Sequence, residues 1–170
     1  MAPFSSLERD DWLDAFQLNV MSVVDYVQAS LYWLKESSAA RIINIASISG
    51  VEPGVLNPNY SCSKAAVINL SKYLANQLAK DNILVNVICP GQVATDARMR
   101  HAEFIAGQEG VSIDEARRKI DQVGADRIPL GKIGESEDIA SLVLFLASEK
   151  AKWITGSSYQ INGGKHKSAY

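Results

Sequence analysis

The chain of 170 residues has little of what several classes of protein require. Its two cysteines, Cys62 and Cys89, are too few for a disulfide framework, and its two histidines leave little for a zinc site. The formal net charge is −2, whereas a general nucleic-acid-binding protein needs a basic face for the phosphates. We therefore expect no metal site and no nucleic-acid partner, and we interpret both cysteines as small core residues.

Long hydrophobic runs are missing as well. The longest strongly apolar run, 139–147, is far shorter than the roughly 20 residues that a membrane-spanning helix needs. The first residues lack the basic region and following apolar stretch of a signal peptide. With 47% hydrophobic and 21% charged residues, the chain can still bury a core, so the sequence predicts a globular, cytoplasmic protein without a membrane partner.

Strand-like and helix-like patterns alternate along the chain, which is typical of βαβ units around a parallel sheet. The segment from Ser5 to Glu8 has the pattern of a capping box and predicts the start of a long helix with one buried apolar stripe. The predicted strands are 41–46, 83–88 and 158–162. The predicted helices are 5–35, 59–79 and 136–148, with two short helices within 92–134.

Tyr60 and Lys64 stand four residues apart in the second long helix, so their side chains share a face. A phenol titrates near pH 10, too high for easy proton exchange at neutral pH, and a neighbouring ammonium favours the phenolate. Such a pair would suit a tyrosine that gives a proton to a nascent alkoxide. The same spacing also occurs in ordinary surface pairs, so by itself it leaves a structural role open.

Further candidate residues lie in the first helix and at the ends of two predicted strands. Ser47 follows the first strand, and Pro90-Gly91 ends the second, with Thr95 shortly after it. Active groups of open α/β sheets gather at the carboxyl ends of strands. Structural alternatives remain: Ser47 could cap a turn, Asn19 could be an ordinary polar helix position, and Pro90-Gly91 could simply end a strand.

Taken together, these residues resemble the short-chain dehydrogenase/reductase family. The resemblance covers essentially the whole chain, and segment 96–127 leans toward the 3-oxoacyl carrier-protein reductase-like branch. It implies an α/β fold, a partial Rossmann-like (doubly wound parallel sheet) domain over 1–170 that binds NAD(P), with a substrate lid at about 92–134. The phrases that resemble the family are Ile-Ile-Asn-Ile-Ala-Ser at 42–47, Tyr-Ser-Cys-Ser-Lys at 60–64, Val-Asn-Val-Ile-Cys-Pro-Gly at 85–91 and Ile-Pro-Leu-Gly-Lys-Ile-Gly at 128–134.

The resemblance also implies a role for each of four residues. Tyr60 would be the general acid in reduction of a small-molecule carbonyl and the base in oxidation of an alcohol. Lys64 would hold the nicotinamide ribose and favour the phenolate form of the tyrosine. Ser47 would hydrogen-bond the substrate oxygen, and Asn19 would hold a water that links Lys64 to solvent.

The cofactor implied by the resemblance is NAD or NADP, and the sequence does not distinguish them. Pro90, Gly91, Val93 and Thr95 would receive the carboxamide side of the nicotinamide ring, beside the contacts of the tyrosine and lysine with the ribose. The family's Gly-rich turn, where backbone amides bind the pyrophosphate, has no counterpart, because the glycines begin at Gly50.

We therefore expect a chain that corresponds to the C-terminal two-thirds of such an enzyme, without its N-terminal strands. Its cofactor affinity, and hence its activity alone, should be greatly weakened. Relatives of this kind form dimers or tetramers, so a homo-oligomer is expected. The alternative is a non-catalytic truncated homologue that acts by oligomerisation with full-length relatives.

Overall fold

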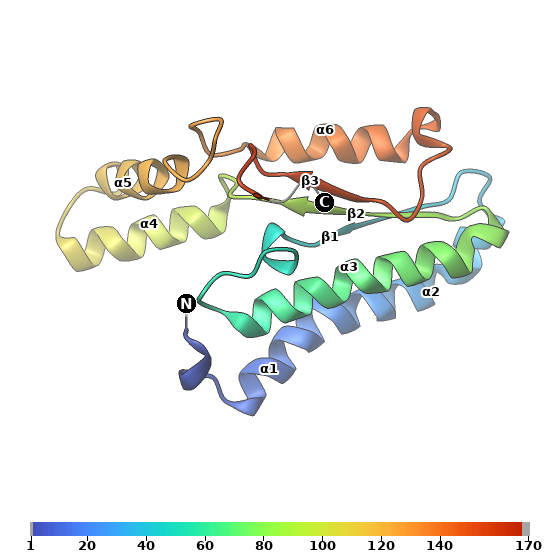
Figure 1. Cartoon of the computed structure of the whole chain (residues 1–170), viewed down its shortest axis with the longest axis horizontal. Helices are drawn as coiled ribbons and strands as arrows, with labels where there is room; N and C mark the ends of the chain where they lie inside the picture. Colours follow the sequence, from blue (N-terminus) through green and yellow to red (C-terminus); the bar gives the residue numbers. More distant parts are fainter. Residues whose placement is uncertain (1, 168–170) are drawn as a thin grey trace. The chain divides into compact units, whose positions relative to one another are not determined.

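A computed structural model of the protein describes residues 2–167 (Figure 1). The chain divides into two compact units. The first contains Met1–Cys89 and Leu142–Gln160, and the second contains Pro90–Ser141 and Ile161–Tyr170.

The sheet has three strands in the order β1-β2-β3. These are β1 (Arg41–Ile45), β2 (Leu84–Pro90) and β3 (Ser158–Ile161). β1 runs parallel to β2, with Ile45 aligned with Ile88. This confirms the predicted α/β fold with a parallel sheet, and it makes β1 an edge strand of the described chain.

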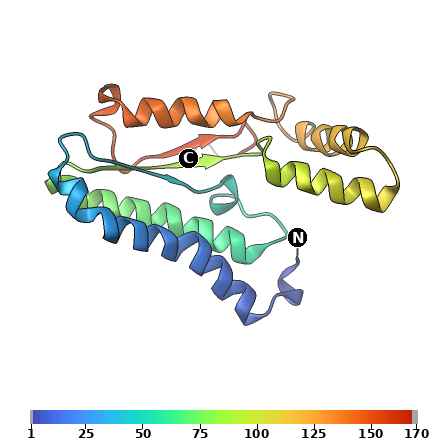
Figure 2. The ribbon, with the colours of Figure 1, turned by 180° about the vertical axis from the view of Figure 1, so that it is seen from behind.

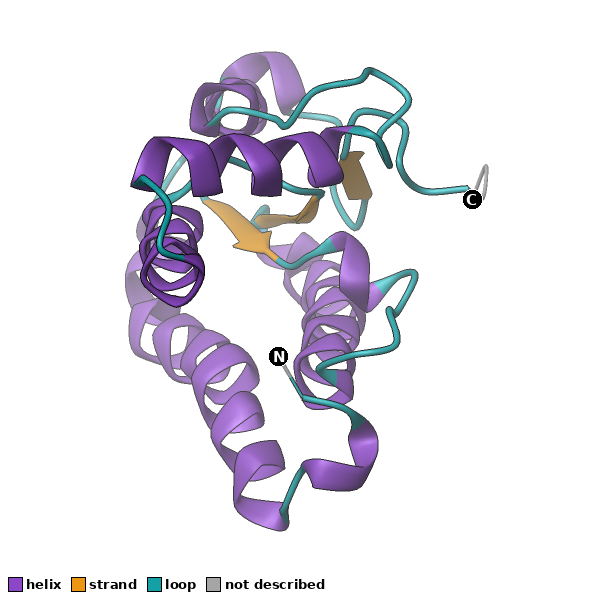
Figure 3. Ribbon diagram, turned by 90° about the vertical axis from the view of Figure 1, so that its left-hand side faces the viewer, coloured by secondary structure: helices purple, strands orange, loops and turns teal. Residues whose placement is uncertain are grey.

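Two long helical segments cover one face of the sheet. The first consists of α1 (Arg9–Phe16), one π-helical turn η2 (Gln17–Met21) and α2 (Ser22–Glu36), and the second is α3 (Pro58–Leu78). Figure 2 shows them side by side, and α3 contacts both α1 and η2. The part of α6 (Ser136–Ala147) that belongs to the first unit lies on the opposite face (Figure 3).

The core of the first unit is built on β2. Residues 85–89 of this strand are all buried, as expected for a strand covered on both faces. Val85 packs in one cluster with Ala75 and Leu78 of α3, and Val87 packs in another with Val67 of the same helix. α3 is therefore held against the sheet along most of its length.

The first helical segment differs from the prediction in three ways. Its N-cap is Glu8, in a capping box with Asp11, so the box predicted at Ser5 is wrong. The segment is also not one continuous α-helix, because η2 interrupts it. The apolar stripe is not fully buried. No residue of α1 or α2 is buried, and Leu13 is 53% exposed. Leu31 and Leu34 of α2 are partly buried against the core of the first unit.

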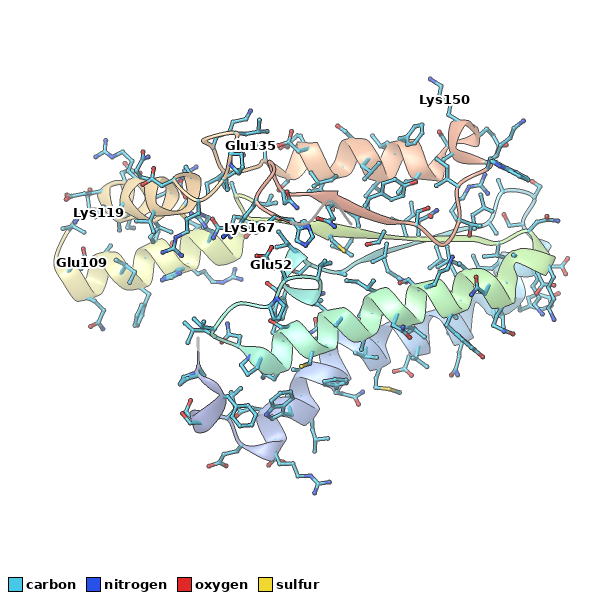
Figure 4. The ribbon with its side chains drawn as sticks, in the orientation of Figure 1. Glu52, Glu109, Lys119, Glu135, Lys150 and Lys167 are labelled. Carbon is cyan, nitrogen blue, oxygen red and sulfur yellow. The ribbon has the colours of Figure 1, made fainter. Side chains whose placement is uncertain are left out.

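The second unit holds the two short helices predicted within 92–134. They are α4 (Asp96–Glu109) and α5 (Ile113–Ala125), which pack against each other. The Ser112 hydroxyl caps α5 by accepting from an amide of its first turn at 3.2 Å. Figure 4 shows Glu109 and Lys119, which form an ion pair of 3.3 Å between the two helices. Arg98 of α4 packs more deeply, with its Nε 2.5 Å from the Asp121 carboxylate of α5.

Short 3-10 turns complete the described chain. They are η1 (Phe4–Ser6), η3 (Ile48–Gly50), η4 (Ala79–Asp81) and η5 (Glu149–Ala151). None of the helices within residues 2–167 has the length and apolar character needed to cross a bilayer.

Candidate active site

Tyr60 and Lys64 lie in the first turns of α3. The helix begins at Pro58, a residue favoured in a first turn because it has no N–H to leave unpaired. The four-residue spacing then puts both side chains on one face, with Lys64 Nζ 5.7 Å from the centroid of the Tyr60 ring. Tyr60 is 37% exposed, so its phenol is open to a small molecule.

Lys64 is the better buried member of the pair. Its Nζ donates a hydrogen bond to the backbone carbonyl of Ile45 at 3.1 Å. Burial lowers the pKa of the Lys64 ammonium below its ordinary value, and the nearby Cys89 thiol offsets part of that effect. The site therefore holds a partly desolvated cation beside a phenol ring, which strengthens the electrostatic interaction between them.

Ser47 follows β1 and is the N-cap of η3. Its hydroxyl oxygen accepts from the backbone N–H of Ser49 at 3.1 Å, so the turn-capping role considered from the sequence is present. A serine hydroxyl has one proton and two lone pairs, and this contact uses only one lone pair. The Ser47 proton can therefore still be donated to another acceptor.

Cys89, next to the end of β2, is fully buried, as predicted for a core residue, whereas Cys62 is exposed. Burial raises the pKa of the Cys89 thiol, and contacts with Ser158, the Ser47 backbone and Lys64 each oppose that shift. Its sulfur lies 3.4 Å from the Ser158 hydroxyl. A neutral thiol in this position fits packing beneath the site better than nucleophilic chemistry.

Asn19 lies within the π-helical turn η2, a feature that is often found at functional sites. Its side-chain Nδ2 donates to the Ala15 carbonyl at 3.0 Å and to the Ser63 hydroxyl at 3.1 Å. Ser63 in turn donates to the backbone carbonyl of Tyr60 at 2.8 Å. The structure thus connects Asn19 to the helix of the Tyr60–Lys64 pair through a residue that the sequence reasoning missed.

The sequence signal that could have indicated Ser63 is its place three residues after Tyr60. A serine at this spacing in a helix can donate back to the earlier carbonyl. Ser63 is 0% exposed, and a pattern of apolar residues could not predict the burial of a serine.

The remaining predicted residues belong to the second unit. Gly91 donates its backbone N–H to the Ile161 carbonyl at 2.7 Å. A Cβ atom at this glycine would lie 2.8 Å from Cα of Asn162, so a side chain would push the two segments apart. Gly91, just after Pro90, is therefore needed for close backbone approach as well as for ending the strand.

Val93 forms a parallel bridge with Gly134. The bonds of this bridge are made by the flanking residues: Ala94 donates to the Gly134 carbonyl at 2.9 Å, and Gly134 donates to the Gln92 carbonyl at 3.1 Å. The N–H and C=O of Val93 itself make no hydrogen bond within residues 2–167. Val93 therefore presents one free backbone donor and one free backbone acceptor.

Thr95 is the N-cap of α4, and its side chain makes no capping hydrogen bond. It lines a cavity of about 500 Å³ within the second unit, together with Met99 of α4 and Asp121 of α5. Val93 lines a different cavity of about 310 Å³, beside Ile128 and Asn162. The two predicted residues therefore line different cavities of the second unit.

Comparisons with known proteins find relatives that are named as reductases. The profile of a family described as Enoyl-(Acyl carrier protein) reductase matches residues 1–166. The 3-oxoacyl-[acyl-carrier-protein] reductase FabG of Haemophilus influenzae is 36% identical over 162 residues, which are 95% of this chain and 61% of that protein. The NADPH-dependent reductase BacG of Bacillus subtilis is 34% identical over 165 residues, 97% of this chain and 62% of BacG.

Solved structures give the same result. The L-sorbose reductase from Gluconobacter frateurii, complexed with NADPH and L-sorbose, matches with a TM-score of 0.91 at 30% identity. That match covers 98% of this chain and 62% of the reductase. YwfH, an NADPH-dependent reductase involved in bacilysin biosynthesis, matches with a TM-score of 0.86 at 32% identity over 98% of this chain and 63% of YwfH. The chain therefore spans about three-fifths of the length of these relatives.

Proposed function

The chain belongs to the short-chain dehydrogenase/reductase family, and we propose that it carries the proton-transfer groups of an oxidoreductase that interconverts a small carbonyl compound and an alcohol. The observation that carries the proposal is the Tyr60–Lys64 pair, an accessible phenol with a partly buried ammonium 5.7 Å from its ring centroid. Lys64 places a positive charge beside the phenol that would exchange a proton with the substrate.

In this proposal each residue has one task. Tyr60 donates its phenolic proton to the developing alkoxide during reduction and removes it during oxidation. Ser47 donates its remaining hydroxyl proton to the substrate oxygen and so fixes the direction of the carbonyl. Lys64 supplies the positive charge, and Asn19 contributes to the path by which the proton is replaced.

The cofactor that we propose is NAD or NADP, a class supported by relatives that are named as NADPH-dependent. When bound, it would supply the hydride. Val93, with Pro90, Gly91 and Thr95, would receive the nicotinamide carboxamide, and Tyr60 and Lys64 would hold the ribose. We propose one Rossmann-like domain over 1–170, with residues 92–134 as the substrate lid.

The test begins with the purified chain, NADH, NADPH and a panel of ketones. Removing the phenol in Tyr60→Phe should lower turnover by about 100-fold or more, the usual contribution of a positioned acid. Tyr73→Phe is the matched control, because Tyr73 is an exposed tyrosine on the same helix, and it should keep the wild-type rate. A Tyr60→Phe chain that retains the wild-type rate would contradict the proposal.

A second candidate function is oligomerisation, which the surface of α1, η2 and α2 favours. Leu18, Tyr26 and Trp33 are 74%, 77% and 72% exposed. Leu18 and Tyr26 also line a groove of about 720 Å³. Apolar exposure of this kind marks interaction surfaces, so we propose a homo-dimer or tetramer, or association with longer relatives, through these helices.

Light scattering tests the second candidate. We expect a mass of two or four chains for the wild type and a monomer for Leu18→Glu. A wild-type monomer over the whole accessible concentration range, with no uptake by a longer relative, would exclude this function.

A further inference from the structure

A buried serine connects the π-helical turn to the helix that carries Tyr60 and Lys64. The Ser63 hydroxyl is 0% exposed and makes two hydrogen bonds. It donates to the Tyr60 carbonyl at 2.8 Å and accepts from Asn19 Nδ2 at 3.1 Å. Neither bond involves a reacting atom, yet both end on residues of the candidate site.

The proton count of these contacts determines the orientation of the Asn19 amide. A hydroxyl has a single proton, and that of Ser63 goes to a backbone carbonyl, so toward Asn19 its oxygen can only accept. The other neighbour of the amide, the Ala15 carbonyl, is also only an acceptor. Both neighbours therefore require the NH₂ end of the amide, and Oδ1 must face elsewhere.

We propose that Ser63 is a positioning residue that fixes the Asn19 amide with its Oδ1 presented as an acceptor. Within residues 2–167, Oδ1 of Asn19 has no hydrogen-bond partner, so it remains available to a donor such as a water molecule. The consequence for catalysis rests on the proposed function, in which Asn19 takes part in proton replacement. The orientation itself does not.

The chain contains a matched control for this inference. Ser71, two turns further along α3, is also buried, donates to the Val67 carbonyl at 2.7 Å and accepts from Asn44 Nδ2 at 2.8 Å. It repeats the chemistry of Ser63 but binds an asparagine of β1 that is outside the candidate site. Loss of either hydroxyl should disturb the packing of α3 to a similar extent. Only the loss of the Ser63 hydroxyl should change the hydrogen bonding of Asn19.

The primary test measures hydrogen exchange of the asparagine side-chain NH₂ groups by NMR on the whole chain. In the wild type, the Nδ2 protons of Asn19 should exchange about tenfold more slowly than those of Asn69, an exposed asparagine of α3. Ser63→Ala should remove most of that protection from one Asn19 proton, and Ser63→Thr should keep it. Ser71→Ala should affect Asn44 and leave Asn19 unchanged.

Two results would overturn the proposal. The first is Asn19 exchange in the wild type as fast as that of Asn69, a comparison that needs no variant and so does not depend on whether Ser63→Ala folds. The second is a folded Ser63→Ala chain in which the Asn19 protons keep both their chemical shifts and their protection.

A kinetic arm connects the orientation to the proposed function. Ser63→Ala should lower kcat with little change in KM and alter its pH profile, and adding Asn19→Ala should cause no further loss, because the two residues act through one contact. Full additivity of the two losses would mean that Ser63 does not act through Asn19. Retained turnover in Tyr60→Phe would instead refute the proposed function, while the exchange result would stand.

Discussion

Lys64 donates a hydrogen bond from Nζ to the carbonyl oxygen of Ile45 at 3.1 Å, joining α3 to the last residue of β1. The cation is thus held at the carboxyl end of a parallel strand, where sheet proteins of this class place their functional groups. Because the ammonium is partly buried there, its protonation is coupled to folding.

This coupling predicts a pH dependence of stability. Burial lowers the pKa of Lys64 in the folded chain, so the unfolded chain binds that proton more tightly. The contribution of Lys64 to the free energy of unfolding should therefore rise with pH, from the lowered pKa up to about 10.4, the value of an exposed lysine. At pH values below the lowered pKa, Lys64 is charged in the folded chain, and its burial destabilises the fold to the full extent.

Urea unfolding of the wild type and Lys64→Met over pH 7 to 11 would measure this contribution as a difference. We expect the free energy of unfolding of the wild type to increase relative to that of Lys64→Met as pH rises. Lys72→Met, at an exposed lysine of the same helix, is the control for loss of one positive charge from α3. A difference between wild type and Lys64→Met that does not change with pH would refute the coupling.

The two cysteines should differ sharply in reactivity. Cys62 is exposed, whereas Cys89 is buried with a raised pKa, so only Cys62 is open to a reagent in the folded chain. Iodoacetamide should therefore label one site in the folded chain and both sites in urea, as read by mass spectrometry. Folded Cys62→Ser should stay unlabelled, and rapid labelling of Cys89 in that variant would show that the strand is not closed around it.

Much of the secondary structure was predictable because it depends on local periodicity. The strand predicted at 83–88 appears at Leu84–Pro90, and the helix predicted at 59–79 appears at Pro58–Leu78. The buried face of that helix was harder to predict, since it includes Ser63 and Ser71, whose burial depends on asparagine partners far away in the sequence. A pattern of apolar residues carries no information about such partners.

The π-helical turn at Gln17–Met21 was not predictable for a related reason. Its residues have ordinary helical character, and the apolar spacing continues through it, so a single long helix was the natural expectation. The site residues themselves were predicted from the order of motifs. The backbone N–H and C=O of Val93 are left unpaired by its bridge to Gly134. The sequence around Val93 and the sequence around Gly134 do not by themselves predict this contact.

Gly50 tests how closely η3 must approach α3. A Cβ atom there would lie 2.7 Å from the backbone N of Ala65 and 2.7 Å from the backbone C of Lys64. Since these are helix backbone atoms, Gly50→Ala should cost about 1–3 kcal/mol of unfolding free energy and displace the lysine. Gly54→Ala is the control, because a Cβ there meets nothing within 4 Å. Equal stability of the two variants in urea would show that the turn adjusts freely.

Gly124 of α5 tests the packing of the second unit. A Cβ atom there would lie 2.5 Å from Oε1 of Gln92, 2.6 Å from Cδ1 of Ile133 and 2.9 Å from Nη2 of Arg98. These atoms are the far ends of side chains, which can move, and alanine also favours the helix by roughly 0.5–1 kcal/mol. Gly124→Ala should therefore cost less than Gly50→Ala.

The comparison that isolates crowding is Gly107→Ala in α4, where a Cβ meets nothing within 4 Å. This variant gains the helix preference without any clash, so it should stabilise the chain by roughly 0.5–1 kcal/mol. Chemical denaturation of the three variants should then rank Gly107→Ala above Gly124→Ala and Gly124→Ala above Gly50→Ala. If Gly124→Ala were as stable as Gly107→Ala, the side chains of Gln92, Ile133 and Arg98 would move aside without loss of stability. The packing between α5 and these side chains would then be loose.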